Sequence, residues 1–248
     1  MPFSDLSLPS ATPFDLNQLA FAAGLRLCVL APHPDDFDAI SLSLRFFHRQ
    51  GAEIYLAVLT DGASGVEDGY KDATDNAAKA RLREAEQKAS CKLFGLPSER
   101  VSFLRLPADE KGNPRLDEAN HTTIRSYLLK HQPQLVWLPH GNDSNVTHQR
   151  TYALFRAVAL QEKMQLWAVL NQDAKTIAMR HDLYMPFDAR DAEWKASLLR
   201  LHDSQQQRNL NTRGHGFDER VLAVNQNSAT ALGLPATYAE VFELERYE

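Results

Sequence analysis

The sequence is poor in cysteine, with only Cys28 and Cys91 among 248 residues. Cys28 falls in an expected strand and Cys91 in an expected helix, so the pair favours neither a disulfide framework nor a cysteine-based zinc site. Long apolar runs are also missing, because the most apolar segment, residues 19–31, is too short to cross a bilayer and contains Arg26. We therefore expect two core thiols and no transmembrane segment.

A surplus of positive charge is absent as well. The formal net charge is -5 at pH 7, and no lysine- and arginine-rich face is evident, which argues against a dedicated binder of nucleic acid or anionic membranes. Residues 1–18 lack the basic start and apolar middle of a signal peptide, so we expect a cytoplasmic protein. The expected partner is a small molecule and not a nucleic acid, and the sequence carries no signal for the oligomeric state.

What the chain does contain is a regular alternation of strand and helix signals. Strands are expected at residues 25–31, 52–59, 101–106 and 135–138, and helices at residues 39–50, 73–94, 117–130 and from 148 onward. This alternation predicts an α/β fold with a mostly parallel sheet and helices on both faces.

Signals are weaker in the last third of the chain. They indicate strands at residues 165–170, 176–184 and 238–247, and helices at residues 191–207 and 218–232. No internal repeat, low-complexity tract or long linker marks a second domain. We expect a single domain over residues 1–248, with residues 1–23 as an N-terminal extension.

The most informative stretch is Pro32-His33-Pro34-Asp35-Asp36-Phe37-Asp38, directly after the first expected strand. In an open α/β sheet, ligands bind beyond the carboxyl ends of the strands, which is where this cluster falls. Asp36 or Asp38 as a helix cap, and His33 as a turn residue, are ordinary alternatives. They do not explain Asp35, because two adjacent carboxylates repel each other unless a cation or a helix dipole offsets them.

A second polar tail, residues 139–148, follows the fourth expected strand and ends in His148. Two tails at one sheet edge can bring His33, Asp35 and Asp36 close to His148. Two imidazoles and one carboxylate form a three-ligand set that leaves open positions, as in catalytic zinc sites. Because Asp35 and Asp36 are adjacent, their side chains should diverge, which suits one ligand and one general base.

These residues resemble the LmbE-like, or PIG-L type, metal-dependent de-N-acetylases, whose hallmark is a His-Pro-Asp-Asp turn after the first strand. The resemblance continues in the same order along the chain. Its further matches are Thr60-Asp61-Gly62, Arg83 with Glu86, a helix opening at His148, Lys195, His202-Asp203-Ser204-Gln205, and Tyr238-Ala239-Glu240 with Phe242.

The resemblance implies a hydrolase of Rossmann-like fold that cleaves the acetamide of an N-acetylated amino sugar or glycoconjugate. It implies that His33, Asp36 and His148 hold the metal and that Asp35 is the general base. Zinc is the usual metal of the family, with iron(II) as an alternative. We expect the substrate to be contacted by Arg83, Asp143 and His202.

The chain departs from the family pattern at three positions. Asn145 stands where the family commonly has a histidine, Phe37 where a glutamate commonly follows the paired aspartates, and Thr147 where an aspartate often precedes the last ligand. We expect Asn145 to support the oxyanion or a sugar hydroxyl in catalysis, since an amide can hydrogen-bond but does not titrate. A helix cap is the alternative role for this residue.

Two other functions compete with deacetylation. Asp36-Phe37-Asp38 imitates the nucleophile and acid of a magnesium-dependent aspartyl phosphatase, although that reading leaves both histidines without a role. A non-catalytic, sugar-binding family member is the second alternative. The loops expected to select the substrate carry no readable pattern; they are residues 63–72, 108–116 and 209–217.

Overall fold

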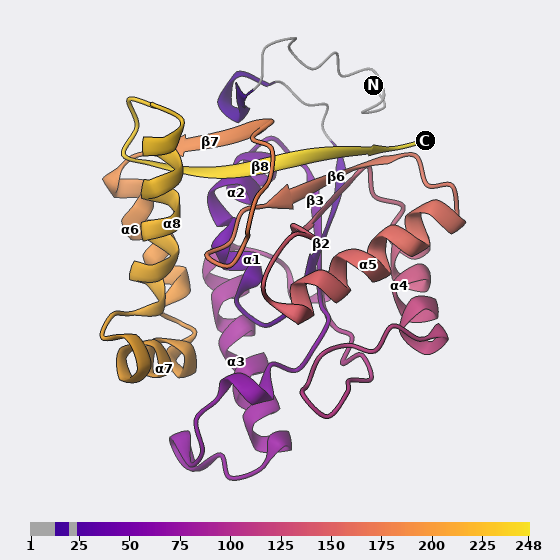
Figure 1. The fold of residues 1–248 in the computed structure, drawn as a ribbon, viewed down its shortest axis with the longest axis vertical. Coiled ribbons are helices and arrows are strands. Elements are labelled where there is room, and N and C mark those ends of the chain that lie inside the picture. The colour runs from indigo at the N-terminus through magenta and orange to yellow at the C-terminus, as the bar shows by residue number, and fades with distance from the viewer. Residues whose placement is uncertain (1–12, 20–23) are drawn as a thin grey trace.

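The computed structural model describes residues 13–19 and 24–248, which are organised around one eight-stranded sheet (Figure 1). The strand order is β1-β7-β8-β6-β5-β2-β3-β4. Most of the expected N-terminal extension, residues 1–12 and 20–23, lies outside the described residues. The part that is described forms β1 (Phe14–Asp15) and the 3-10 helix η2 (Leu16–Gln18).

The larger half of the sheet is parallel. It comprises β2 (Arg26–Ala31), β3 (Glu53–Val58), β4 (Val101–Phe103), β5 (Leu135–Pro139) and β6 (Leu166–Asn171). The long strand β8 (Tyr238–Tyr247) runs antiparallel to both β6 and β7 (Leu183–Phe187), and β1 pairs parallel to β7. The expected α/β class with a mostly parallel sheet is confirmed.

Eight α-helices are described. They are α1 (Asp36–Ala39), α2 (Ser41–Arg49), α3 (Asn76–Phe94), α4 (Glu118–His131), α5 (Val146–Gln161), α6 (Ala189–Leu199), α7 (Asp203–Arg213) and α8 (Phe217–Ala231). Three short 3-10 segments, η3 (Ala63–Gly65), η4 (Tyr70–Asp72) and η5 (Ser98–Arg100), lie in the connections.

Side-chain oxygens fix where several long helices begin. Asp75 accepts a hydrogen bond from the Ala78 amide at 2.6 Å before α3, and Asp117 accepts one from the Asn120 amide at 3.0 Å before α4. α3 ends at Gly95, whose φ of 92° is a left-handed conformation that glycine adopts without a steric penalty.

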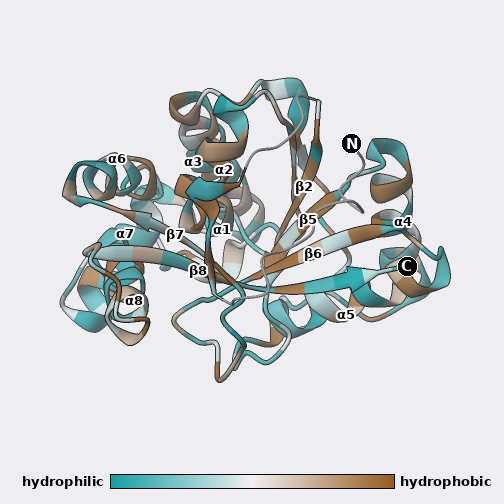
Figure 2. Cartoon of the chain, turned by 90° about the horizontal axis from the view of Figure 1, so that it is seen from above, coloured by the Kyte–Doolittle hydropathy of each residue, from teal (hydrophilic) through white to brown (hydrophobic). Residues whose placement is uncertain are grey.

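The central strand β2 buries both of its faces. Leu27, Val29 and Ala31 join one apolar core with residues of α2, α3 and α6, whereas Cys28 and Leu30 join another with α4 and α5. Figure 2 shows these helix groups on opposite sides of the sheet. The alternation explains why β2 reads as a continuous apolar run in the sequence. Cys28 and Cys91 are both free and buried, as expected.

Three expected elements are wrong in their bounds. The helix expected at residues 191–207 is two helices, because the chain turns at His202 and the buried imidazole contacts Asp38. The strand expected at 176–184 lies instead at Leu183–Phe187, since the Ile177 amide donates to the Asn142 carbonyl outside the sheet. The strand expected at 101–106 stops at Phe103.

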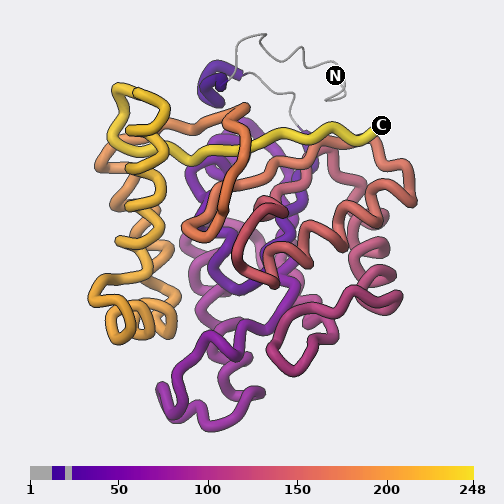
Figure 3. The backbone as a smooth tube through the Cα atoms, viewed as in Figure 1, coloured from indigo at the N-terminus to yellow at the C-terminus, as the bar shows by residue number. Residues whose placement is uncertain are grey.

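The C-terminal helices stand together beside β7 and β8 (Figure 3). α8 packs against β8, α6 contacts both α3 and α8, and α7 contacts both α3 and α8. The ends of α7 and α8 therefore reach the edge of the sheet where β2, β5 and β6 end. Within the described residues, no helix is long and apolar enough to cross a membrane.

Candidate functional site

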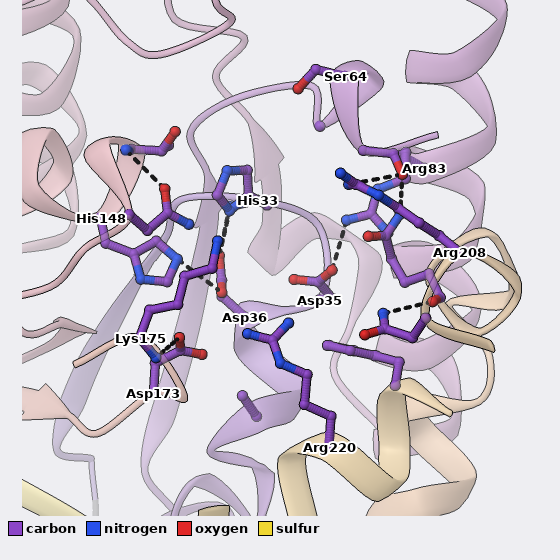
Figure 4. A pocket seen from close by; sticks show the side chains of 18 of the residues that line it. His33, Asp35, Asp36, Ser64, Arg83, His148, Asp173, Lys175, Arg208 and Arg220 are labelled. Atoms are coloured by element: carbon purple, nitrogen blue, oxygen red, sulfur yellow. Dashed lines mark hydrogen bonds and ion pairs between the residues drawn. The ribbon is translucent and has the colours of Figure 1, made fainter. Parts of the chain in front are cut away.

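A cavity of about 460 Å³ opens at the carboxyl ends of the parallel strands (Figure 4). Its walls come from the segments that follow β2, β3, β4, β5 and β6, and from α3, α5, α7 and α8. Each of the three loops expected to select the substrate contributes lining residues. These are Ser64 and Gly65, Lys111, Gly112 and Asn113, and Asn209, Thr212, Arg213 and Phe217.

The turn after β2 holds Asp35 in an uncommon backbone conformation, with φ of 124° and ψ of -26°. A non-glycine residue with positive φ costs about 1–3 kcal/mol and persists only where its surroundings enforce it. The Asp35 amide donates to Oε1 of Gln87 at 2.9 Å, and the amide of His33 donates to Oδ2 of Asp36 at 2.7 Å. The first bond holds the backbone of the turn, and the second fixes the direction of the Asp36 carboxylate.

Arg83, in the first half of α3, holds this turn in place. Its side chain is 2% exposed, and it donates to the Pro34 carbonyl and to Oδ2 of Asp35, the latter at 2.7 Å. Gly62, after β3, passes close by with φ of 64°. A Cβ atom there would lie 2.9 Å from Cδ of Pro34 and 3.1 Å from Nε of Arg83. Glycine is therefore required for both the conformation and the space.

The structure brings His33, Asp36 and His148 together. One ligand atom from each lies within 4.8 Å of the others. Nδ1 of His33 is 3.3 Å from Asp36, and Nε2 of His148 is 3.7 Å from Asp36. Nδ1 of His148 is 3.0 Å from Oδ2 of buried Asp143, so Nε2 is the nitrogen left to face Asp36. A carboxylate behind a ligating imidazole is the usual outer partner in zinc sites.

The electrostatics at this cluster favour positive charge. Burial acts to lower the pKa of His148, but the hydrogen bond with Asp143 and the charge of Asp36 outweigh it and raise the pKa to about 9. Burial acts to raise the pKa of Asp36, but hydrogen bonding and charge from His33 and the charge of His148 bring it down to about 2. A divalent cation bound between these side chains would take the place of the proton that their charges favour.

Asp35 lies beside this cluster, and its Oδ2 is held by Arg83 (Figure 4). Asp36 points to the two histidines and Asp35 points to Arg83, as the adjacent placement of the two aspartates predicts (Figure 4). Asp35 lines the cavity although it is only 8% exposed. Burial raises the pKa of Asp35, and the Arg83 guanidinium acts in the opposite direction.

Asn145 lines the same cavity and also begins α5. Its Oδ1 accepts a hydrogen bond from the Thr147 amide at 3.0 Å, so the capping role is present. The cap uses only the carbonyl oxygen of the side chain. The amide nitrogen of Asn145 makes no hydrogen bond within the described chain and is free to meet a ligand.

Two residues expected to contact substrate lie behind the cavity wall. Asp143 and His202 are both fully buried, and neither lines the cavity. Asp143 holds His148 as described above, and Nε2 of His202 is 2.6 Å from Oδ2 of Asp38. Their position makes them supports of the site, whereas Arg83, the third such residue, does reach the cavity wall.

Several cavity residues are missing from the sequence-based prediction. Asp173 and Lys175 follow β6, so their position after a parallel strand is the sequence signal that places them at the same edge as His33 and His148. Arg208, Arg213 and Arg220 come from α7 and α8. No local pattern identifies them, because their place in the cavity depends on how the two helices pack.

The sequence of this chain matches one family model. Residues 28–159 match the model of the PIG-L family, described as GlcNAc-PI de-N-acetylase. No curated protein matches the chain.

Similar folds are found among solved structures. N,N'-diacetylchitobiose deacetylase from Pyrococcus horikoshii has a TM-score of 0.73 at 18% identity, with 99% of this chain and 86% of that chain covered. The zinc-inhibited form of teicoplanin deacetylase Orf2 has a TM-score of 0.65 at 16% identity, with coverages of 90% and 99%. GalB, the 4-carboxy-2-hydroxymuconate hydratase from Pseudomonas putida KT2440, has a TM-score of 0.68 at 16% identity, with coverages of 91% and 97%. At these identities the likeness shows a shared fold.

Proposed function

This chain belongs to the PIG-L family, and on that premise we propose that it is a metal-dependent hydrolase that removes an N-acetyl group from an amino sugar or a glycoconjugate. One observation carries the proposal: His33, Asp36 and His148 converge on one point beside Asp35, inside the polar cavity at the carboxyl edge of the sheet. We propose that the whole chain forms one catalytic unit of Rossmann-like type.

The residues present fit a divalent cation. Two imidazoles and one carboxylate suit zinc or iron(II) better than magnesium, which prefers oxygen ligands. His33, Asp36 and His148 would hold the ion, and Asp143 would orient the His148 ring from behind. When bound, such a cation lowers the pKa of water and polarises a substrate carbonyl.

The side chains around this point supply the proton transfers. Asp35 accepts the proton of the water that attacks the acetamide carbonyl, with its carboxylate oriented by Arg83. The amide nitrogen of Asn145 donates to the oxygen that becomes negative as the tetrahedral intermediate forms. Asp35 then delivers its proton to the leaving nitrogen, so that acetate and a free amine are the products.

The class of substrate rests on relatives. The family is described by an N-acetylglucosamine-containing substrate, and one structural neighbour acts on diacetylchitobiose. Another neighbour was studied in a zinc-inhibited form, so iron(II) deserves testing beside zinc. GalB has the same fold and is a hydratase, so the fold alone does not distinguish amide hydrolysis from hydration.

The aspartyl phosphatase alternative is not supported. It requires Asp38 as an acid in the cavity, but Asp38 is fully buried and bonded to His202, Ser90 and Gln87. A carboxylate enclosed in this way cannot reach a substrate oxygen. The non-catalytic alternative keeps the metal site and predicts binding without turnover.

The test is a turnover assay with metal-replete protein. N-acetylated sugars, sugar phosphates and acetylated amines are incubated separately with zinc-loaded and iron(II)-loaded enzyme, and released acetate is measured. We expect acetate from at least one N-acetylated amino sugar, and none after chelation of the metal. Sugar binding without acetate release from any metal-loaded form would favour the non-catalytic alternative.

A further inference from the structure

The cavity is much more basic than the chain as a whole. Six lysines and arginines line it against three aspartates, although the chain has a formal net charge of -5. Two of the aspartates, Asp35 and Asp36, are engaged by Arg83 and by the two histidines. The positive charge that remains comes from Lys111, Lys175, Arg208, Arg213 and Arg220.

None of these five cations forms an ion pair within the described chain, and three of them are arginines. Arg213 and Arg220 form no ion pair, and Arg208 donates only to the Gly65 carbonyl at 3.3 Å. Of the other 15 arginines, ten each pair with a carboxylate, and the remaining five form no ion pair in the described chain but do not line the cavity. In an acidic protein, unpaired guanidinium groups gathered at one cavity are available for an anion that the protein does not supply.

The three arginines belong to one wall. They come from the second half of α7 and the first turn of α8, which meet near Gly214 and Gly216. Figure 4 shows Arg208 and Arg220 extending into the cavity from this side and Lys175 extending from the opposite wall. The Lys175 amide donates to Asp173 at 3.0 Å, which fixes the start of that side chain. We call Arg208, Arg213 and Arg220 the arginine wall.

We infer that the arginine wall binds an anionic group, a phosphate or a carboxylate, carried by the amino-sugar substrate close to its acetamide. The inference rests on the proposed function for the identity of the sugar. A guanidinium presents parallel N–H donors that match the oxygens of either anion, and a cleft lined by one sign of charge focuses its field on the ligand. Neutral sugar hydroxyls need no such unpaired charge. The wall lies beyond residues 28–159, so the family match does not assign it.

The experiment compares three probes that share one N-acetylated sugar. N-acetylglucosamine methyl glycoside is neutral, N-acetylglucosamine 1-phosphate carries a phosphate, and N-acetylmuramic acid carries a carboxylate. We measure kcat/KM for acetate release from each with metal-loaded enzyme. We expect one anionic probe to exceed the neutral probe by about tenfold or more, as one charge-assisted contact permits. The better of the two anionic probes identifies the group.

Variants of the wall assign the preference to its residues. Arg220→Gln and Arg208→Gln should each lower the anionic-to-neutral ratio of kcat/KM by about tenfold, and Arg220→Lys should retain part of the preference. The matched control is Arg190→Gln on α6, an exposed arginine without an ion pair that does not line the cavity. It should leave the ratio unchanged. Thermal melting of every variant shows whether the fold is retained.

A binding measurement separates this inference from the proposed function. Calorimetry follows the affinity of N-acetylglucosamine 1-phosphate and N-acetylmuramic acid for wild type and Arg220→Gln. If no probe releases acetate but an anionic probe binds and loses about tenfold in affinity in Arg220→Gln, the wall is supported and the proposed deacetylase function fails. If acetate is released equally from neutral and anionic probes in wild type and variants, the proposed function stands and the inference is overturned. Absence of both turnover and binding overturns both.

Discussion

The protein contains two groups of histidines and acids that look alike in sequence and differ in their surroundings. In the cavity, His33, Asp36 and His148 face one another across less than 4.8 Å with space between them. Asp38, in α1, and His202, between α6 and α7, are both fully buried. Oδ2 of Asp38 lies 2.6 Å from Nε2 of His202. The first group could hold a cation between its ligand atoms, whereas the carboxylate and the imidazole of the second group are bonded directly to each other.

The buried group continues into a scaffold for the cavity turn. Lys195, also fully buried, donates to the Ala39 carbonyl at 2.6 Å, to Asn225 at 2.8 Å and to Glu240 at 2.7 Å. Glu240 in turn accepts from the amides of Leu42 and Ser43 at 3.1 and 2.8 Å. This network ties the end of α1 and the start of α2 to α6 and β8. The two groups therefore differ in what they leave exposed: the buried one has its carboxylate and imidazole paired inside the fold, and the cavity one keeps ligand atoms open to a cavity.

The largest effect is expected on turnover, when Asp35 in the cavity is replaced. Asp35→Asn should lower kcat by about 10²- to 10⁴-fold, because positioned general bases contribute that much. Metal content should not change, since Asp35 points to Arg83 and not to the histidines. Acetate release and metal analysis on the same preparation check both statements. Wild-type turnover in metal-replete Asp35→Asn protein would remove Asp35 from the mechanism.

A change in the buried network around Lys195 should lower the free energy of unfolding. Lys195→Met leaves the Glu240 carboxylate buried without its cation, which should lower the free energy of unfolding by about 3–5 kcal/mol. Urea titration measures the loss. The double variant Lys195→Met/Glu240→Gln removes the unpaired charge and should recover part of it. If the double variant is no more stable than the single one, the ion pair is not the source of the effect.

Asn145 combines a structural position with a cavity position, because it both caps α5 and lines the cavity. A catalytic donor role predicts that Asn145→Ala loses about 10² to 10³ in turnover, and a cap role predicts a loss of about 1 kcal/mol in stability. Asn145→Asp distinguishes them, since aspartate still caps a helix but opposes an oxyanion. We expect this variant to be stable and slow. A fully active Asn145→Asp enzyme would leave only the cap.

A smaller effect, on metal affinity, is expected when Asp143 behind the cavity wall is replaced. Asp143→Asn weakens the partner that orients His148, and changes of this kind cost about 10- to 100-fold in metal affinity. Competition with a chromophoric chelator measures the affinity. Asp173→Asn, which removes a charge within 4.8 Å of His148 but no hydrogen bond to it, is the control for charge alone and should change affinity less. An equal loss in both variants would indicate a general effect of charge.

Much of this architecture follows from the sequence. Strand tails at one edge of a parallel sheet place His33 and His148 together, and this argument needs only the positions of β2 and β5. It does not predict that His202 is buried behind the cavity, because the burial of that imidazole depends on how α6, α7 and β8 pack. The same packing creates the arginine wall, which cannot be predicted from a net charge of -5. The break between α6 and α7 at His202 is likewise tertiary in origin, since the bond to Asp38 decides it.

The most direct test compares metal binding by two histidine variants. Zinc stoichiometry is measured by elemental analysis after dialysis for wild type, His148→Ala and His202→Ala, with circular dichroism to confirm that each is folded. We expect one zinc per wild-type chain, retention of the metal in folded His202→Ala protein, and loss of stoichiometric binding in His148→Ala. Full zinc occupancy in His148→Ala together with loss in His202→Ala would contradict this expectation.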